Sequence, residues 1–150
     1  MVYDIETVQR SIELLGGHKS WGFNLDPANM MMYGIDVELF VDLLGDRIWS
    51  VHAKDAQIVR HNVRRSGLNP YGNYRRIDRG FRFRIPGWGS IQWKDLLTEL
   101  AMVGYFGVLS FEHEDITMSR LDGMKKTAEF LKPLLIDAPF EGSRDLNFRF

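Results

Sequence analysis

The sequence of 150 residues contains no cysteine, so it offers neither a disulfide framework nor thiolate ligands for a metal. It has no run approaching the roughly 20 apolar residues that a membrane-spanning helix needs. The net charge of -1 gives no general attraction to nucleic acid or to anionic membranes. The first residues lack the basic start and apolar core of a secretory signal. These absences favour a globular protein, with a cytoplasmic location expected by default.

Helices and strands are predicted to alternate along the chain. Apolar residues at helical spacing, with capping residues at the ends, predict helices at 4–15, 36–44, 90–103 and 117–135. Short apolar runs predict strands at 21–26, 48–55 and 107–112. This alternation implies an α/β fold with parallel strands and right-handed crossovers. Residues 56–89, which are rich in turn residues, are predicted to be the least regular region, and residues 136–150 an extended tail.

Each predicted strand ends in polar side chains. Asp26 follows the first strand, His52 lies near the end of the second, and Glu112 ends the third. The C-terminal ends of neighbouring parallel strands lie at one edge of a sheet, so these side chains are expected to converge. One imidazole and two carboxylates suit a divalent cation such as Mn²⁺, Mg²⁺, Co²⁺ or Zn²⁺. The alternative is a hydrogen-bonded polar rim without a metal.

Four segments carry a resemblance to a known family. They are 24–27 (NLDP), 47–55 (RIWSVHAKD), 86–93 (PGWGSIQW) and 110–115 (SFEHED). In order and spacing they resemble the last three strands of the xylose isomerase-like TIM barrels, a family of sugar isomerases and epimerases. A full (β/α)8 barrel takes about 250 residues. The resemblance therefore implies that residues 1–135 form the C-terminal part of a (β/α)8 TIM barrel whose N-terminal strands are absent, followed by the tail 136–150.

The resemblance also implies a ligand set and a mechanism. In this family a Glu, an Asp, a His and a second Glu hold one divalent metal ion, and Asp26, His52 and Glu112 match the last three. The first Glu has no counterpart here. The family's two glutamates act as an acid/base pair that moves a proton through an enediolate, and Glu112 matches one of them. We therefore expect this chain alone to have little or no isomerase activity, which leaves open whether it is itself an enzyme.

Five further residues are candidate substrate-binding groups for a small sugar or sugar derivative. Asn29 stands where the family often has a His, and it can still hydrogen-bond a hydroxyl group. Lys54 and Asp55 are expected either to orient His52 or to reach a substrate oxygen, or else to form an ordinary salt-bridged pair. Arg84 and Trp88 are the residues of the long irregular region 56–89 that are expected nearest the site from the sequence, and Trp88 is equally consistent with a packing role.

The segment between residues 60 and 84 holds eight arginines and one acidic residue, Asp78. Arginine suits a carboxylate or phosphate, so an anionic sugar derivative is one interpretation. Interleaved aromatic residues could stack on bases, although nucleic acid is not the expected partner. A solvated loop or a subunit contact would explain the same composition.

Other functions remain open. An endonuclease IV-like phosphodiesterase needs a His-rich cluster of three zinc ions, and four histidines are few for it. A lyase or dehydratase would use the same ligands as an isomerase. A non-catalytic assembly module, paired with a second copy or a complementing N-terminal half, would cover the open edge of the sheet.

Overall fold

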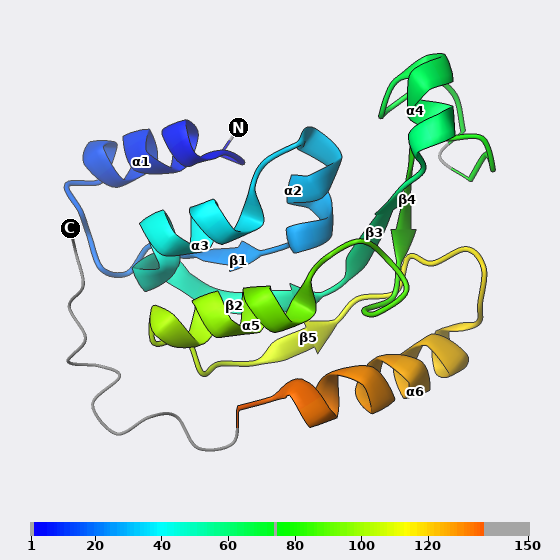
Figure 1. Ribbon diagram of the computed structural model, residues 1–150. Helices are drawn as coiled ribbons and strands as arrows, with labels where there is room; N and C mark the ends of the chain where they lie inside the picture. The colour runs from blue at the N-terminus through cyan, green and yellow to red at the C-terminus, as the bar shows by residue number, and fades with distance from the viewer. Residues whose placement is uncertain (1, 74, 137–150) are drawn as a thin grey trace.

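The computed structural model describes residues 2–73 and 75–136 (Figure 1). In chain order the elements are α1 (Ile5–Leu14), β1 (Phe23–Leu25), α2 (Pro27–Tyr33), α3 (Val37–Leu44), the 3-10 turn η1 (Gly45–Arg47), β2 (Ile48–Ala53), β3 (Asp55–Ile58), α4 (Arg60–Ser66), β4 (Phe81–Arg84), α5 (Trp93–Met102), β5 (Leu109–Phe111), α6 (Arg120–Leu131) and the 3-10 turn η2 (Lys132–Leu134).

Three strands form a parallel sheet in the order β1-β2-β5, as the predicted α/β fold requires. The central strand β2 pairs in regular register with β5, so that His52 lies opposite Ser110. The pairing of β1 with β2 is irregular, since Phe23 lies opposite Ile48 while the next residue, Asn24, lies opposite Ser50. Trp49 is therefore an extra residue in β2, and its side chain is 57% exposed. The sheet with its flanking helices is consistent with part of a TIM barrel.

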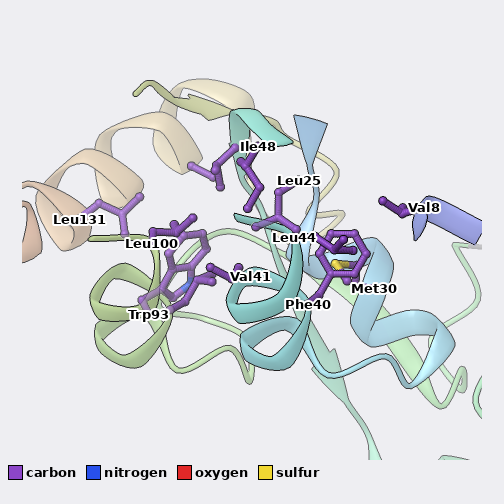
Figure 2. Packing of buried hydrophobic residues seen from close by; sticks show 13 residues of the cluster. Val8, Leu25, Met30, Phe40, Val41, Leu44, Ile48, Trp93, Leu100 and Leu131 are labelled. Atoms are coloured by element: carbon purple, nitrogen blue, oxygen red, sulfur yellow. The ribbon is translucent and has the colours of Figure 1, made fainter. Parts of the chain in front are cut away.

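The hydrophobic core lies between the parallel sheet and its helices. Figure 2 shows the side chains of α3 and α5 gathered beside those of β1 and β2. Val41, Val51, Leu96 and Leu100 are almost completely buried, and the indole ring of Trp93 fills the space at the start of α5. Burial of these groups supplies the main favourable free energy of folding, and it fixes the sheet whose end carries the polar residues.

The region predicted to be least regular contains an antiparallel hairpin. Strand β3 pairs with β4 so that Asp55 lies opposite Arg84 and Ile58 opposite Phe81. Figure 1 shows this hairpin extending away from the parallel sheet, with α4 at its far end. The prediction of one strand over 48–55 was wrong at its end, because β2 stops at Ala53 and Asp55 already belongs to β3. The turn residues in this long connection indicated irregular structure, so the short strands β3 and β4 were not predicted.

Helix α2 was not predicted at all. Asp26 is its N-cap and accepts a hydrogen bond from the backbone N–H of Asn29, and Pro27 occupies the first turn, where a proline needs no N–H partner. Other boundaries also differ: β1 and β5 are shorter than the strands predicted at 21–26 and 107–112, α5 begins at Trp93 rather than Ser90, and α6 covers Arg120–Leu131, with η2 after it. The predicted tail lies almost wholly outside the described residues, which end at 136.

Candidate metal centre

The ends of three parallel strands bring together Asp26, His52 and Glu112. One potential ligand atom from each residue lies within 4.8 Å of the other two, and all three side chains are partly buried. Asp26 follows β1, His52 lies in β2 and Glu112 follows β5, so the backbone ladder of the sheet places them side by side. In residues 2–73 and 75–136 this is the group of acidic and histidine side chains that could hold a metal ion. We call it the Asp-His-Glu triad.

The triad contains two buried atoms that face each other without a hydrogen bond of normal geometry. Nδ1 of His52 lies 2.6 Å from Oε2 of Glu112 and 3.5 Å from Oδ2 of Asp26, yet neither Nδ1 of His52 nor Oε2 of Glu112 has an aligned hydrogen-bond partner. Buried polar atoms nearly always have partners. A cation bound between an imidazole nitrogen and carboxylate oxygens would satisfy both atoms, so the residues present fit a divalent metal ion.

Lys54 is buried beside the triad and touches its carboxylates. Its Nζ lies 3.5 Å from Oδ2 of Asp26 and 3.3 Å from Oε1 of Glu112, and it forms a close ion pair with Glu114. Burial lowers the pKa of Lys54, but the hydrogen bond to Glu114 and the charges of Asp26, Glu114 and Glu112 outweigh it, so the pKa is raised above its usual value. The three carboxylates and the one ammonium have a formal charge of -2 together, which one divalent cation would balance.

Asn29 orients Asp26. Its side-chain Nδ2 donates to Oδ2 of Asp26 at 2.7 Å, and its backbone N–H donates to Oδ1 at 3.0 Å. Both contacts depend on α2, because Asp26 is the N-cap of that helix. The structure therefore brings Asn29 and Lys54 to the triad.

Asp55 has a different position. It is completely buried, and its Oδ1 accepts from the backbone N–H groups of Ala56, Ser90 and Ile91. Its Oδ2 accepts from the backbone of Gly87 and, at 2.9 Å, from Nε1 of Trp93. Burial raises the pKa of Asp55, against the opposing effect of the hydrogen bonds from Trp93 and the backbone.

Four of these five hydrogen bonds come from the loop between β4 and α5 or from the first residue of α5, and they make Asp55 the anchor of that loop. Gly89 is required beside it, because a Cβ at residue 89 would lie 2.0 Å from Oδ1 of Asp55. A carboxylate held in this way has no exposed oxygen to offer a substrate. The alternative ordinary pair between Lys54 and Asp55 is not formed either, because Lys54 pairs with Asp26, Glu112 and Glu114.

Arg84 and Trp88 form a separate group with Asp115. Nε of Arg84 lies 2.8 Å from Oδ2 of Asp115, and its guanidinium group lies 5.6 Å from the centroid of a half-exposed Trp88 ring. Asp115 is buried and also accepts from the backbone N–H of Ile85 and from Thr117. The sequence analysis assigned no role to Asp115, although this residue directly follows Glu114 and lies close to the end of a predicted strand.

The comparisons with known proteins identify the family. The family model of the xylose isomerase-like TIM barrel matches residues 1–134, and the chain belongs to this family. The family includes sugar isomerases and epimerases as well as endonuclease IV-like enzymes, and its members often bind divalent metals and small-molecule sugar substrates.

Two relatives extend the comparison. The uncharacterized protein YfiH of Bacillus subtilis (strain 168) is 33% identical over 135 residues, which are 88% of this chain and 42% of YfiH. The crystal structure of a xylose isomerase domain protein from Planctomyces limnophilus superposes with a TM-score of 0.64 at 23% identity, over 89% of this chain and 42% of that one. At that identity the likeness shows the TIM-barrel fold alone. The chain thus spans about two fifths of the length of either relative.

Helix length and hydropathy also bear on location. Within the part of the chain that the structure describes, no helix is both long and apolar enough to cross a membrane.

Proposed function

We propose that this chain carries the metal-holding part of a divalent-metal-dependent isomerase or epimerase that acts on a sugar or sugar derivative by proton transfer. The observation that carries the proposal is the Asp-His-Glu triad, whose His52 and Glu112 atoms face each other unpaired at the ends of neighbouring strands. Membership of a family that includes such isomerases supports the same assignment.

Each residue of the triad has a distinct task in this proposal. Asp26 and His52 hold the ion, with Asp26 fixed by the N-terminus of α2 and His52 by the central strand. Glu112 shares in holding the ion and removes or returns a proton at the carbon beside the sugar carbonyl. A bound divalent ion would supply positive charge beside the oxygens on which negative charge develops in the enediolate.

The surrounding groups position these residues and the substrate. Lys54 holds Glu112 and Glu114 in place through its ammonium group. Asn29 fixes both oxygens of Asp26 and places an amide beside the triad. Arg84 and Trp88 would contact substrate only from the neighbouring loop, and Asp55 supports the site by anchoring that loop.

Turnover needs a second acid/base group in the family's mechanism. Among the described residues the triad has no fourth ligand, and Glu114 is engaged by Lys54. We therefore expect the 150-residue chain to bind metal without measurable isomerase activity by itself. A partner chain that brings a second acid/base group to the triad would complete the site.

Two other functions are less well supported. An endonuclease IV-like phosphodiesterase would need several zinc ions and more histidine ligands, and within the described residues the triad contains one His. A non-catalytic assembly module is consistent with the open edges of the sheet, but it gives no reason for unpaired buried atoms in the triad. Native mass spectrometry would separate pairing of copies from a monomer.

Metal binding provides the direct test. Titration of Mn²⁺ into the wild-type chain, followed by calorimetry, should show one site per chain, and His52→Ala should weaken binding by at least about tenfold, in the range seen when a metal site is disturbed. His61→Ala is the matched control, because His61 is exposed on α4. Equal binding by wild type and His52→Ala would remove His52 from the ligand set. Ketose turnover by the isolated chain would refute the expected inactivity.

A further inference from the structure

A pocket of about 190 Å³ lies beside the triad, between β4 and the residues that follow β5. Its apolar walls are Met32 of α2, Phe81 and Phe83 of β4, and Ile116. The two phenylalanine rings pack edge to face, with centroids 4.8 Å apart. The space is enough for several water molecules, or for a small charged group with the carbons that bear it.

The pocket adjoins the triad through Lys54. Nζ of Lys54 lies 4.0 Å from the ring centroid of Phe83, and the carboxylate of Glu114, which lines the pocket, is the ion-pair partner of the same ammonium. A ligand whose sugar carbons face the triad would therefore extend its far end toward Phe83. Because Glu114 is neutralised by Lys54, it adds little net negative charge to the pocket.

Arg79 gives the pocket its unusual chemistry. Its side chain is 8% exposed, so the guanidinium group is removed from water. It donates to the carbonyl of Gly72 and the side chain of Asn69, which are both neutral acceptors. A buried charge is normally paired with an opposite charge, and no ion pair of Arg79 with a carboxylate occurs in the described part of the chain. A guanidinium group has five N–H donors, so several remain available.

The acidic residue next to Arg79 is committed elsewhere. Asp78 forms ion pairs with Arg65 and Arg76, and the hydrogen bond from Arg76 with the nearby guanidinium charges lowers its pKa to about 2. A second arginine, Arg82, also lines the pocket and donates to the carbonyl of Ile77. The pocket therefore combines two arginines without carboxylate partners and an aromatic wall.

We infer that this pocket binds the anionic end, a carboxylate or a phosphate, of a ligand whose hydroxyl-bearing carbons face the Asp-His-Glu triad. The inference rests on the proposed function and narrows its substrate class to an acidic sugar derivative, a sugar acid or a sugar phosphate. Arg79 is the principal partner of the anion, since its planar fork matches two oxygens of either group. Phe81 and Phe83 exclude water from the contact and strengthen it.

Three probes that share a six-carbon polyol chain test the inference: sorbitol, gluconate and sorbitol 6-phosphate. Each is titrated calorimetrically into the full chain, with and without Mn²⁺. We expect gluconate, sorbitol 6-phosphate or both to bind about tenfold more tightly than sorbitol, the factor that one charge-assisted hydrogen bond provides. Which of the two binds better identifies the anionic group. Equal binding of all three probes, or binding of none, would overturn the inference.

Substitutions locate the effect. Arg79→Gln and Arg82→Gln should each reduce the advantage of the anionic probe, with Arg79→Gln removing most of it. Arg65→Gln is the matched control, because Arg65 is exposed, is paired with Asp78 and lies outside the pocket lining. Urea unfolding of each variant checks that it is folded. If Arg79→Gln is unfolded, the anionic preference of Arg82→Gln is the result that tests the assignment. An unchanged anionic preference in the folded variants would refute the assignment.

The two proposals can fail separately. If His52→Ala abolishes Mn²⁺ binding but wild type shows no anionic preference, the metal centre stands and the pocket assignment is wrong. If Mn²⁺ does not bind while gluconate or sorbitol 6-phosphate binds through Arg79, the pocket stands and the proposed metal function fails.

Discussion

His52 lies in β2 and Asp55, three positions later, begins β3, but their side chains are in opposite situations. His52 has a buried nitrogen that faces a carboxylate oxygen with no aligned hydrogen bond. Asp55 accepts five hydrogen bonds and is completely buried. We refer to the second arrangement as the Asp55 anchor.

The difference shows how supporting and reacting groups are separated within one short segment. The Asp55 anchor uses all its oxygens to hold a loop and has none left for a ligand. The Asp-His-Glu triad keeps polar atoms without partners, at a cost in stability, and these atoms are available to an ion. Substitutions in the two arrangements should therefore change different measured quantities. Substitutions at the anchor should change the free energy of unfolding, and substitutions in the triad should change ligand binding.

The largest expected effect is on the anchor. In Asp55→Ala the backbone of the 87–91 loop and Nε1 of Trp93 lose their acceptor, and because each buried donor without a partner costs about 1–3 kcal/mol, we expect a loss of about 4 kcal/mol in the free energy of unfolding. Urea denaturation measures it. The control Asp36→Ala removes an exposed helix N-cap and should cost about 1 kcal/mol. Similar losses in both variants would show that Asp55 is not an anchor.

A smaller effect is expected where the loop approaches the anchor. Gly89→Ala places a Cβ against Oδ1 of Asp55, and the displacement should cost about 2–3 kcal/mol, as overpacking of a buried site does. The control Gly104→Ala has open space for its Cβ but a φ of +78°, so it should cost only about 1 kcal/mol for the left-handed backbone. If the control is the more damaging of the two, the close approach at Gly89 is not important for stability.

Asp115 is a second fully bonded carboxylate and allows a test by pH. Burial raises its pKa, but hydrogen bonds from Thr117 and Arg84 outweigh this and leave the pKa below its usual value of 3.8. Its contribution to stability is therefore present above pH 3.8 and is lost as pH falls through the lower pKa of the folded protein. Asp115→Asn should cost about 2 kcal/mol at neutral pH.

Urea denaturation at several pH values checks the sign of this contribution. The difference between wild type and Asp115→Asn should shrink in acid. A difference that stays constant below pH 3.8 would show that the charge of Asp115 does not contribute.

The smallest expected effect is on metal affinity. Lys54→Met removes the ammonium group that contacts the carboxylates of Asp26, Glu112 and Glu114 and competes with a metal ion for them. Mn²⁺ should therefore bind about tenfold more tightly, which corresponds to about 1.4 kcal/mol in binding free energy. Calorimetry measures the change, and Lys126→Met, in a surface pair with Asp122 on α6, serves as a control. Weaker binding in Lys54→Met would mean that the positioning of Glu112 and Glu114 by Lys54 matters more for metal affinity than the positive charge that its ammonium places beside the triad.

The parallel sheet and the meeting of its polar ends followed from the sequence. Each strand is a short apolar run that stops at a polar residue. Because the C-terminal ends of parallel strands lie at one edge of the sheet, Asp26, His52 and Glu112 were predicted to lie close together. The caps Asp4 and Asp36 also predicted their helices, because a capping carboxylate acts within three residues of itself.

The hairpin and the Asp55 anchor could not be predicted in the same way. Strands β3 and β4 are four residues each and are separated by more than twenty residues. A short turn sequence, which would predict a tight hairpin, is therefore not present between them. The partners of Asp55 lie up to 38 positions away, and its sequence neighbour Lys54 suggested a salt bridge that does not form. The assignments of metal and substrate residues, and the boundary of the domain near residue 135, remain predictions.

The extra residue in β2 has a consequence for the alignment of the triad. If β1 and β2 paired regularly from Phe23 opposite Ile48, Leu25 would lie opposite Ser50; in the structure it lies opposite Val51. Continuing each alignment by one residue places Asp26 level with His52 only when Trp49 is skipped. A shift of one residue in a strand turns every side chain to the other face. The exposed Trp49, which contributes no ligand, is thus the spacer that sets Asp26 and His52 at the same height.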